Sequence, residues 1–111
     1  MRFKTCVLLS AALLAAPLPA AFGGNDAYTL TIKDHRFEPT ELKVPAGQKL
    51  RLTVRNLDST PEEFESYELN REKIIPGGKS SGVYIGPLEA GRYPFFGEFH
   101  QETAQGVIIA E

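Results

Sequence analysis

The chain alternates apolar and polar residues over short stretches, and this period of two constrains its fold more than any other feature. Residues 28–33 read Tyr-Thr-Leu-Thr-Ile-Lys, and residues 49–55 read Lys-Leu-Arg-Leu-Thr-Val-Arg. Successive side chains of a β-strand point to opposite faces, so each stretch presents one apolar face to a core. Turn-forming residues such as 45–47 and 76–78 separate such stretches. The pattern predicts an all-β domain without a long amphipathic helix.

The positions of these stretches predict a β-sandwich of seven to eight strands, with antiparallel pairing. We expect strands near residues 28–33, 42–44, 49–55, 63–67, 83–85, 92–96 and 107–110, whereas residues 69–75 are ambiguous. We expect the following apolar side chains to be mostly buried: Leu30, Ile32, Val44, Leu50, Leu52, Val54, Phe64, Tyr93, Phe95, Val107 and Ile109. A register shift of one residue in any strand would turn its apolar set towards solvent.

The N-terminus has the pattern of a secretory signal peptide. Arg2 and Lys4 precede an apolar segment, and small residues surround positions 20–24. We therefore predict a signal peptide over residues 1–23, cleaved at about 20–24, and one mature domain over residues 24–111. The apolar segment is short and is interrupted by prolines, so we expect no permanent membrane span. The predicted location is the periplasm.

Cysteine usage and charge exclude several classes of function. Cys6 is the only cysteine and lies within the predicted signal peptide, so the mature domain has no thiolate and no disulfide. The chain has 12 Lys and Arg against 14 Asp and Glu, and loss of Arg2 and Lys4 leaves 10 against 14. An acidic exported domain is not typical of a nucleic-acid binder, and its charge attracts cations.

Three motifs together give the chain a family resemblance. They are Phe37-x-Pro39 followed by Leu42-Lys43-Val44-Pro45-Ala46-Gly47; Leu52-Thr53-Val54-Arg55-Asn56 leading into the loop at Pro61; and Gly91-Arg92-Tyr93 with Gly106 downstream. With these motifs the chain resembles the cupredoxin-like superfamily. The resemblance covers nearly the whole mature domain. It implies a cupredoxin-like Greek-key β-sandwich.

Within that superfamily the chain is most similar to the EfeO-type cupredoxin domain. The residues that carry this similarity are Glu63-Phe64-Glu65 and the segment 71–77, Arg-Glu-Lys-Ile-Ile-Pro-Gly. The similarity implies a periplasmic accessory protein of bacterial ferrous-iron uptake, with an iron permease or another uptake component as partner. It implies at most an accessory, ferroxidase-type enzymatic role, in which the protein assists Fe(II) oxidation or delivers the ion.

The family resemblance also assigns positions to the metal ligands. Small copper proteins of this superfamily carry Tyr-x-x-x-Cys-x-x-His in the strand and loop that start here at Tyr93. The cysteine position is then Gly97, and the histidine position is His100. The first histidine position, just after Pro61, is Glu62, and the methionine position falls near Ala104. A blue-copper centre needs a thiolate, so we expect none.

The remaining candidate ligands are carboxylates and the imidazole of His100. We predict that His100 approaches the Glu63/Glu65 pair at one end of the sandwich, with Glu98 and Glu72 as weaker ligands. His35 lies in a predicted turn, and its two interpretations are a surface residue and a second imidazole ligand. Carboxylates with an imidazole suit iron, manganese or Cu(II). The predicted cofactor is therefore an iron or copper ion without a thiolate ligand.

Two other functions compete with this prediction. One is a copper carrier or copper-dependent redox partner that uses His100, His35 and carboxylates. The other is a non-metal interaction module, because glutamates that alternate on a strand are also typical of an ordinary solvated face and Glu72 has the neighbours of a surface ion pair. A hydrolase is not indicated, since no nucleophile and base pair is recognisable in the sequence.

Overall fold

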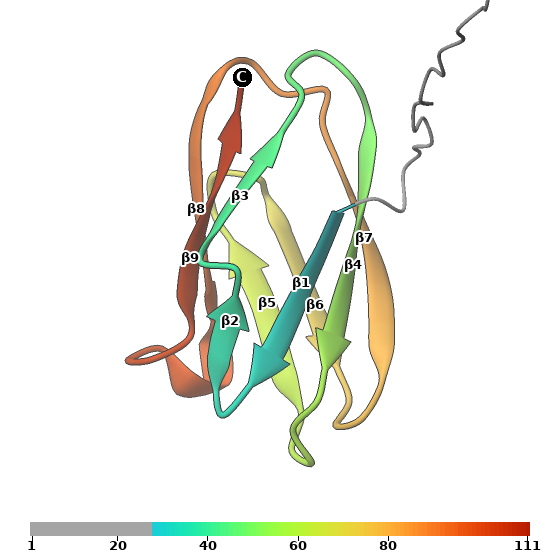
Figure 1. Ribbon diagram of the computed structural model, residues 1–111, viewed down its shortest axis with the longest axis vertical. Helices are drawn as coiled ribbons and strands as arrows, with labels where there is room; N and C mark the ends of the chain where they lie inside the picture. The colour runs from blue at the N-terminus through green and yellow to red at the C-terminus, as the bar shows by residue number, and fades with distance from the viewer. Residues whose placement is uncertain (1–27) are drawn as a thin grey trace, which may run out of the picture.

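Two β-sheets packed face to face form the domain in the computed structural model, which describes residues 28–111 (Figure 1). The strands are β1 (Tyr28–Lys33), β2 (Arg36–Glu38), β3 (Glu41–Val44), β4 (Leu50–Asn56), β5 (Glu62–Ser66), β6 (Arg71–Ile75), β7 (Ser80–Ile85), β8 (Gly91–Gly97) and β9 (Gln105–Ala110). One 3₁₀ turn, η3 (Glu98–His100), joins β8 to β9. The predicted all-β sandwich is confirmed, with nine strands in the described part where seven to eight were expected. The predicted signal peptide lies outside the described residues.

The sheets are mixed, which differs from the predicted antiparallel pairing. One sheet has the order β2-β1-β4-β7 and the other the order β3-β9-β8-β5-β6. Within them β1 pairs with β4 in parallel, and β3 pairs with β9 in parallel. Alternation of side chains is the same in both kinds of pairing, so the sequence pattern gives no information on strand direction. The ambiguous segment 69–75 contains strand β6.

Three aromatic side chains form the centre of the core between the sheets. Phe37 and Phe95 contact each other edge to face with ring centroids 4.9 Å apart, and Phe64 lies 5.2 Å from Phe95. All three are at most 1% exposed. Edge-to-face aromatic contacts add specific geometry to apolar burial. The core therefore joins β2, β5 and β8, which come from both sheets.

Most of the expected core is confirmed, but three predicted residues are only half-buried. In β9 the inward side chains are Ile108 and Ala110, so the prediction for Val107 and Ile109 was wrong by one residue. The segment Val-Ile-Ile-Ala lacks alternation, and pairing with β3 and β8 sets its register. Tyr93 is also half-buried and donates its hydroxyl proton to the carbonyl oxygen of Glu89.

Three connections meet at one end of the sandwich. They are the β1–β2 turn, the loop between β4 and β5, and η3 with the loop that follows it, all towards the lower end in Figure 1 and opposite the C-terminus. Within residues 28–111, the structure contains no helix with the length and hydrophobicity that a membrane span requires.

Candidate functional site

A buried carboxylate lies at the centre of this end of the sandwich. Glu62, the first residue of β5, is 1% exposed and points towards the interior, like Phe64 two residues later. Its Oε1 accepts hydrogen bonds from the backbone N–H groups of Glu63 and Phe99, both at 2.9 Å. Its Oε2 lies 2.7 Å from Nδ1 of His100. A buried carboxylate requires such partners, and here two backbone donors and the ring nitrogen of His100, from two segments, satisfy it.

The β1–β2 turn places a second histidine at the same end. Asp34 and His35 both have left-handed backbone conformations, with φ of 53° and 59°. The carboxylate of Asp58 accepts hydrogen bonds from both backbone N–H groups, at 2.7 and 2.9 Å. The hydroxyl of Thr103 donates to the carbonyl oxygen of His35. Contacts from two other loops therefore hold His35 in a conformation that non-glycine residues adopt rarely.

The side chain of Asn56 fixes the loop that carries Asp58. Asn56 is 1% exposed; its side-chain oxygen accepts from the backbone N–H of Asp58, and its amide donates to the carbonyl oxygens of Thr60 and Ile75. Partial burial of Asp58 opposes its ionisation, but the two backbone donors and the nearby His35 and His100 rings outweigh it. The pKa of Asp58 is consequently below its ordinary value.

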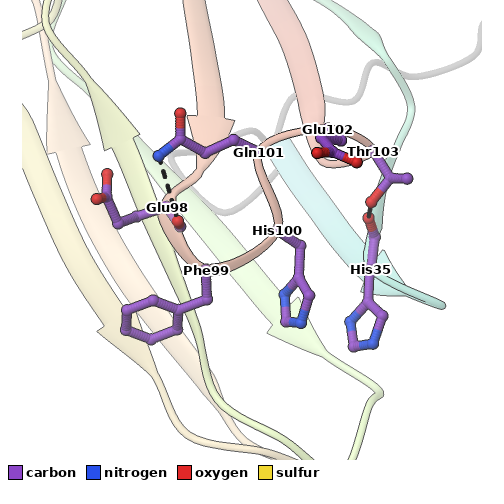
Figure 2. A pocket seen from close by; sticks show the side chains of 7 residues that line it. All are labelled: His35, Glu98, Phe99, His100, Gln101, Glu102 and Thr103. Atoms are coloured by element: carbon purple, nitrogen blue, oxygen red, sulfur yellow. Dashed lines mark hydrogen bonds between the residues drawn. The ribbon is translucent and has the colours of Figure 1, made fainter.

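The imidazole rings of His35 and His100 stack against each other. Their centroids are 3.6 Å apart and their planes differ by 13°. Figure 2 shows the two rings side by side, extending in the same direction from different loops. Each ring has a carboxylate oxygen near Nδ1: Glu62 at 2.7 Å from His100 and Asp58 at 3.5 Å from His35. Among the described residues, no protein atom forms a hydrogen bond with either Nε2.

The stacked rings line a shallow pocket at the surface. Its lining comes from the β1–β2 turn and from η3 and the residues after it: His35, Glu98, Phe99, His100, Gln101, Glu102 and Thr103. The side chain of Phe99 is 46% exposed beside it. The pocket therefore combines two imidazoles, two carboxylates at its rim and one exposed aromatic ring.

Three of the predicted ligands form a separate group on the outer face of the second sheet. Carboxylate oxygens of Glu63, Glu65 and Glu72 all lie within 4.8 Å of one another. Glu65 and Glu72 are directly opposite each other on β5 and β6. Partial burial, and then the neighbouring carboxylate of Glu72, raises the pKa of Glu63; partial burial and the charges of Glu72 and Glu98 raise that of Glu65.

The predicted site is thus divided between two faces of β5. Glu63 and Glu65 alternate with Glu62 and Phe64, so their side chains leave the strand on the face opposite to the carboxylate that contacts His100. His100 is not a member of the cluster of Glu63, Glu65 and Glu72. Among the described residues, His100 and the Glu63/Glu65 pair therefore do not approach one another as predicted.

His35 and His100 do meet, as the hypothesis of a second imidazole required, and Glu98 lies at the rim of their pocket. The residue that the sequence analysis did not select is Glu62. Its position after Pro61 corresponds to the first histidine ligand in the resemblance, and its period-two spacing with Phe64 indicates an inward side chain. Those two signals together would have found it.

Comparison with known proteins assigns the family. The family model described as "Cupredoxin-like domain" matches residues 6–110. The chain belongs to this cupredoxin-like family. An uncharacterized protein of Rickettsia prowazekii (strain Madrid E) is 51% identical over 80 residues, which are 72% of this chain and 64% of the relative. The cupredoxin-like chain thus spans somewhat less than two thirds of that curated relative.

Solved structures of copper proteins share the fold. Amicyanin from Paracoccus versutus superimposes with a TM-score of 0.62 at 19% identity, over 82% of this cupredoxin-like chain and 87% of amicyanin. The "blue" copper protein auracyanin A from Chloroflexus aurantiacus gives 0.64 at 14% identity, over 75% and 96%. A purple cupredoxin from Nitrosopumilus maritimus gives 0.59 at 19% identity, over 76% and 99%. These similarities show that the chain shares the cupredoxin fold.

The residues of this cupredoxin-like domain do not fit a copper–thiolate centre. Residues 28–111 contain no cysteine, and a Cβ atom at Gly97 would lie 2.7 Å from the carboxylate of Glu62. Imidazole and carboxylate groups are ligand types that suit ions taking nitrogen and oxygen ligands. Carboxylates at Nδ1 orient metal-binding histidines in many proteins and leave Nε2 for the ion.

Proposed function

We propose that this cupredoxin-like protein is a periplasmic metal-binding accessory protein that holds Cu(II) or iron through His100 and His35. The observation that supports this proposal most directly is the pair of carboxylate–imidazole contacts. Glu62 and Asp58 each lie at Nδ1 of one ring, and Nε2 of each ring has no protein partner among residues 28–111. The hydrogen-bonded contact with Glu62 fixes the orientation of the His100 ring and raises the basicity of its ligand nitrogen, whereas Asp58 makes a longer contact of 3.5 Å with the His35 ring.

The stacked arrangement supports weak binding of the proposed ion. Lone pairs of imidazole nitrogens lie in the ring plane, and the planes of His35 and His100 are only 13° from parallel. Their lone pairs therefore do not converge on one point, and a chelate with both rings requires one ring to turn. An ion that is bound by one imidazole, or by two after a small rearrangement, exchanges readily. This property suits delivery of the ion more than permanent storage.

The pathway that we propose is ferrous-iron uptake. The similarity to EfeO-type domains supports it, through Glu63-Phe64-Glu65 and the segment 71–77. The protein would assist oxidation of Fe(II) or deliver the ion to an iron permease. Deletion of the gene should lower ferrous-iron uptake by whole cells, and normal uptake in the deletion strain would contradict this role.

Metal affinity tests the site itself. Isothermal titration of the mature protein, purified without an affinity tag, with Cu(II) and with anaerobic Fe(II) should show binding at micromolar concentration. His100→Ala should lower the affinity more than tenfold, and His35→Ala should lower it by a smaller factor. Glu63→Gln is the matched control. It removes a charge from β5, the strand of Glu62, but on the opposite face, and we expect no change in metal affinity.

The affinity should also fall as the pH falls, because the ligating imidazoles must be neutral. If both histidine variants bind as tightly as the wild type, the site is elsewhere. A loss in Glu63→Gln alone would assign the ion to the group of Glu63, Glu65 and Glu72.

One observation favours a second function, that of an interaction module without a metal. Two backbone donors and the ring nitrogen of His100 already satisfy the Glu62 carboxylate, so this end of the sandwich is ordered without an ion. The exposed ring of Phe99 beside the pocket would then contribute to protein contacts. The absence of binding for Cu(II), Fe(II) and Mn(II) at micromolar concentration would favour this function over the first.

A further inference from the structure

The backbone conformation at position 97 does not require a glycine. Its φ of −96° and ψ of 116° lie in the extended region that any residue adopts. The restriction at this position is space. A Cβ atom on Gly97 would lie 2.7 Å from Cδ and Oε2 of Glu62, and 2.7 Å from Cβ of Ala104. Real Cβ atoms do not approach other heavy atoms so closely, so the Glu62 carboxylate and a side chain at position 97 exclude each other.

The Glu62 carboxylate has little freedom to move away from a new side chain. It is 1% exposed, and both of its oxygens are occupied. Displacement would leave the backbone N–H groups of Glu63 and Phe99 without their acceptor and would separate Nδ1 of His100 from Oε2. Unpaired buried polar groups are costly. The carboxylate thus connects β5 to η3 through contacts that depend on the bare Cα of Gly97.

We infer that Glu62 and Gly97 form one built unit, in which the carboxylate takes the space beside Gly97 and closes the Nδ1 side of His100 to metal ions. Metal ions then reach His100 only through Nε2; this second statement rests on the proposed metal function. In the small copper proteins that the chain resembles, a histidine ligand and the cysteine ligand stand at the positions of Glu62 and Gly97. Here a carboxylate opposite a glycine replaces that pair and orders the loop without an ion.

The metal-free protein provides the first test. Because a carboxylate only accepts hydrogen bonds, His100 must carry its proton on Nδ1. Nitrogen-15 NMR of the full mature chain should show His100 as a single Nδ1–H form, with slow exchange of that proton. Glu62→Gln and Gly97→Ala should both abolish this signature, although the second variant adds only a methyl group.

Gly82→Ala is the matched control for the added methyl. Position 82 is in β7, and the three heavy atoms nearest to a Cβ there belong to the guanidinium group of Arg51, the end of a long side chain. This variant should retain the His100 signature. Retention of the signature in Gly97→Ala as well would overturn the inference, because the methyl would then coexist with the carboxylate.

A double variant covers the case in which Gly97→Ala does not fold. The change in urea midpoint caused by Gly97→Ala should be smaller in a Glu62→Ala background than in the wild type, since the clash with the carboxylate is gone. If Glu62→Ala folds and Glu62→Ala/Gly97→Ala does not, the carboxylate is not what excludes the methyl, and the inference fails.

Addition of Zn(II), a diamagnetic probe, tests whether Glu62 closes the Nδ1 side of His100 to metal ions. We expect the nitrogen-15 resonance of His100 Nε2 to shift, while Nδ1 keeps its proton. Loss of the Nδ1 proton with Zn(II) bound to Nδ1 would refute the closure. If neither Cu(II) nor Fe(II) binds in the calorimetric titration, the proposed metal function fails, whereas the metal-free spectra of Gly97→Ala and Glu62→Gln still decide whether the built unit exists.

Discussion

Glu62→Leu should be one of the most destabilising single substitutions at this end of the sandwich. Leucine is somewhat larger than glutamate and accepts no hydrogen bond. The backbone N–H groups of Glu63 and Phe99 lose their acceptor, at about 1–3 kcal/mol each. Loss of the contact with His100 adds about 1 kcal/mol. Burial of the leucine side chain offsets about 1–2 kcal/mol.

The net loss for Glu62→Leu is therefore about 1–6 kcal/mol in the free energy of unfolding, with a central value of about 3–4 kcal/mol. Glu62→Gln is the reference variant. Its amide oxygen can still accept from both backbone N–H groups, and its amide nitrogen can face His100 in the other tautomer. We expect a loss of only about 1 kcal/mol, which in a domain of this size lowers Tm by about 4–8 °C.

Urea unfolding followed by circular dichroism measures both values in metal-free protein. The m-value should be unchanged, since the substitution is local. If Glu62→Leu is as stable as Glu62→Gln, or more stable, then the two backbone donors find other acceptors. The Glu62 carboxylate would then not hold η3 to β5.

Three further predictions concern other parts of the domain. Glu72→Gln should raise Tm at pH 7, because Glu72 faces Glu65 directly across the strand pair and like charges in that position destabilise a sheet. The pKa of Glu65 is raised, so its unfavourable effect grows as the pH rises through that pKa; an equal gain in Tm at acidic pH would contradict this reasoning. Ile108→Ala should lower the free energy of unfolding by about 2–4 kcal/mol, and Ile109→Ala by less than half as much, since only the first side chain is fully buried. Urea unfolding that ranks them in the opposite order would refute the observed register of β9. Asp58→Ala should cost about 1–2 kcal/mol at neutral pH, because two backbone N–H groups lose their acceptor. The lowered pKa of Asp58 means that its contribution is present above the ordinary carboxyl range and is lost as the pH falls through the lowered value, so thermal melts of both proteins should converge in strong acid.

The amino-acid sequence determined the class of fold, because a strand with one buried face requires apolar residues at alternate positions, and this pattern can be recognised in a short segment. Period-two alternation in residues 28–33 and 49–55 identified two strands whose inward residues are buried as predicted. Alternation cannot identify the inward side chains where consecutive residues are all apolar. In residues 107–110 the pairing with β3 and β8 selected Ile108, and no local pattern could do so.

The sequence also selected His100, because its distance from Tyr93 is fixed within one strand and loop. Only the tertiary structure decided what His100 contacts. Its neighbours His35 and Glu62 are 65 and 38 residues away in the chain, and they reach it because the β1–β2 turn and the first residue of β5 lie at the same end of the sandwich. Local spacing determines which way a side chain leaves its strand. Contact between side chains from different strands depends on how the strands are ordered and packed, and that information is not local.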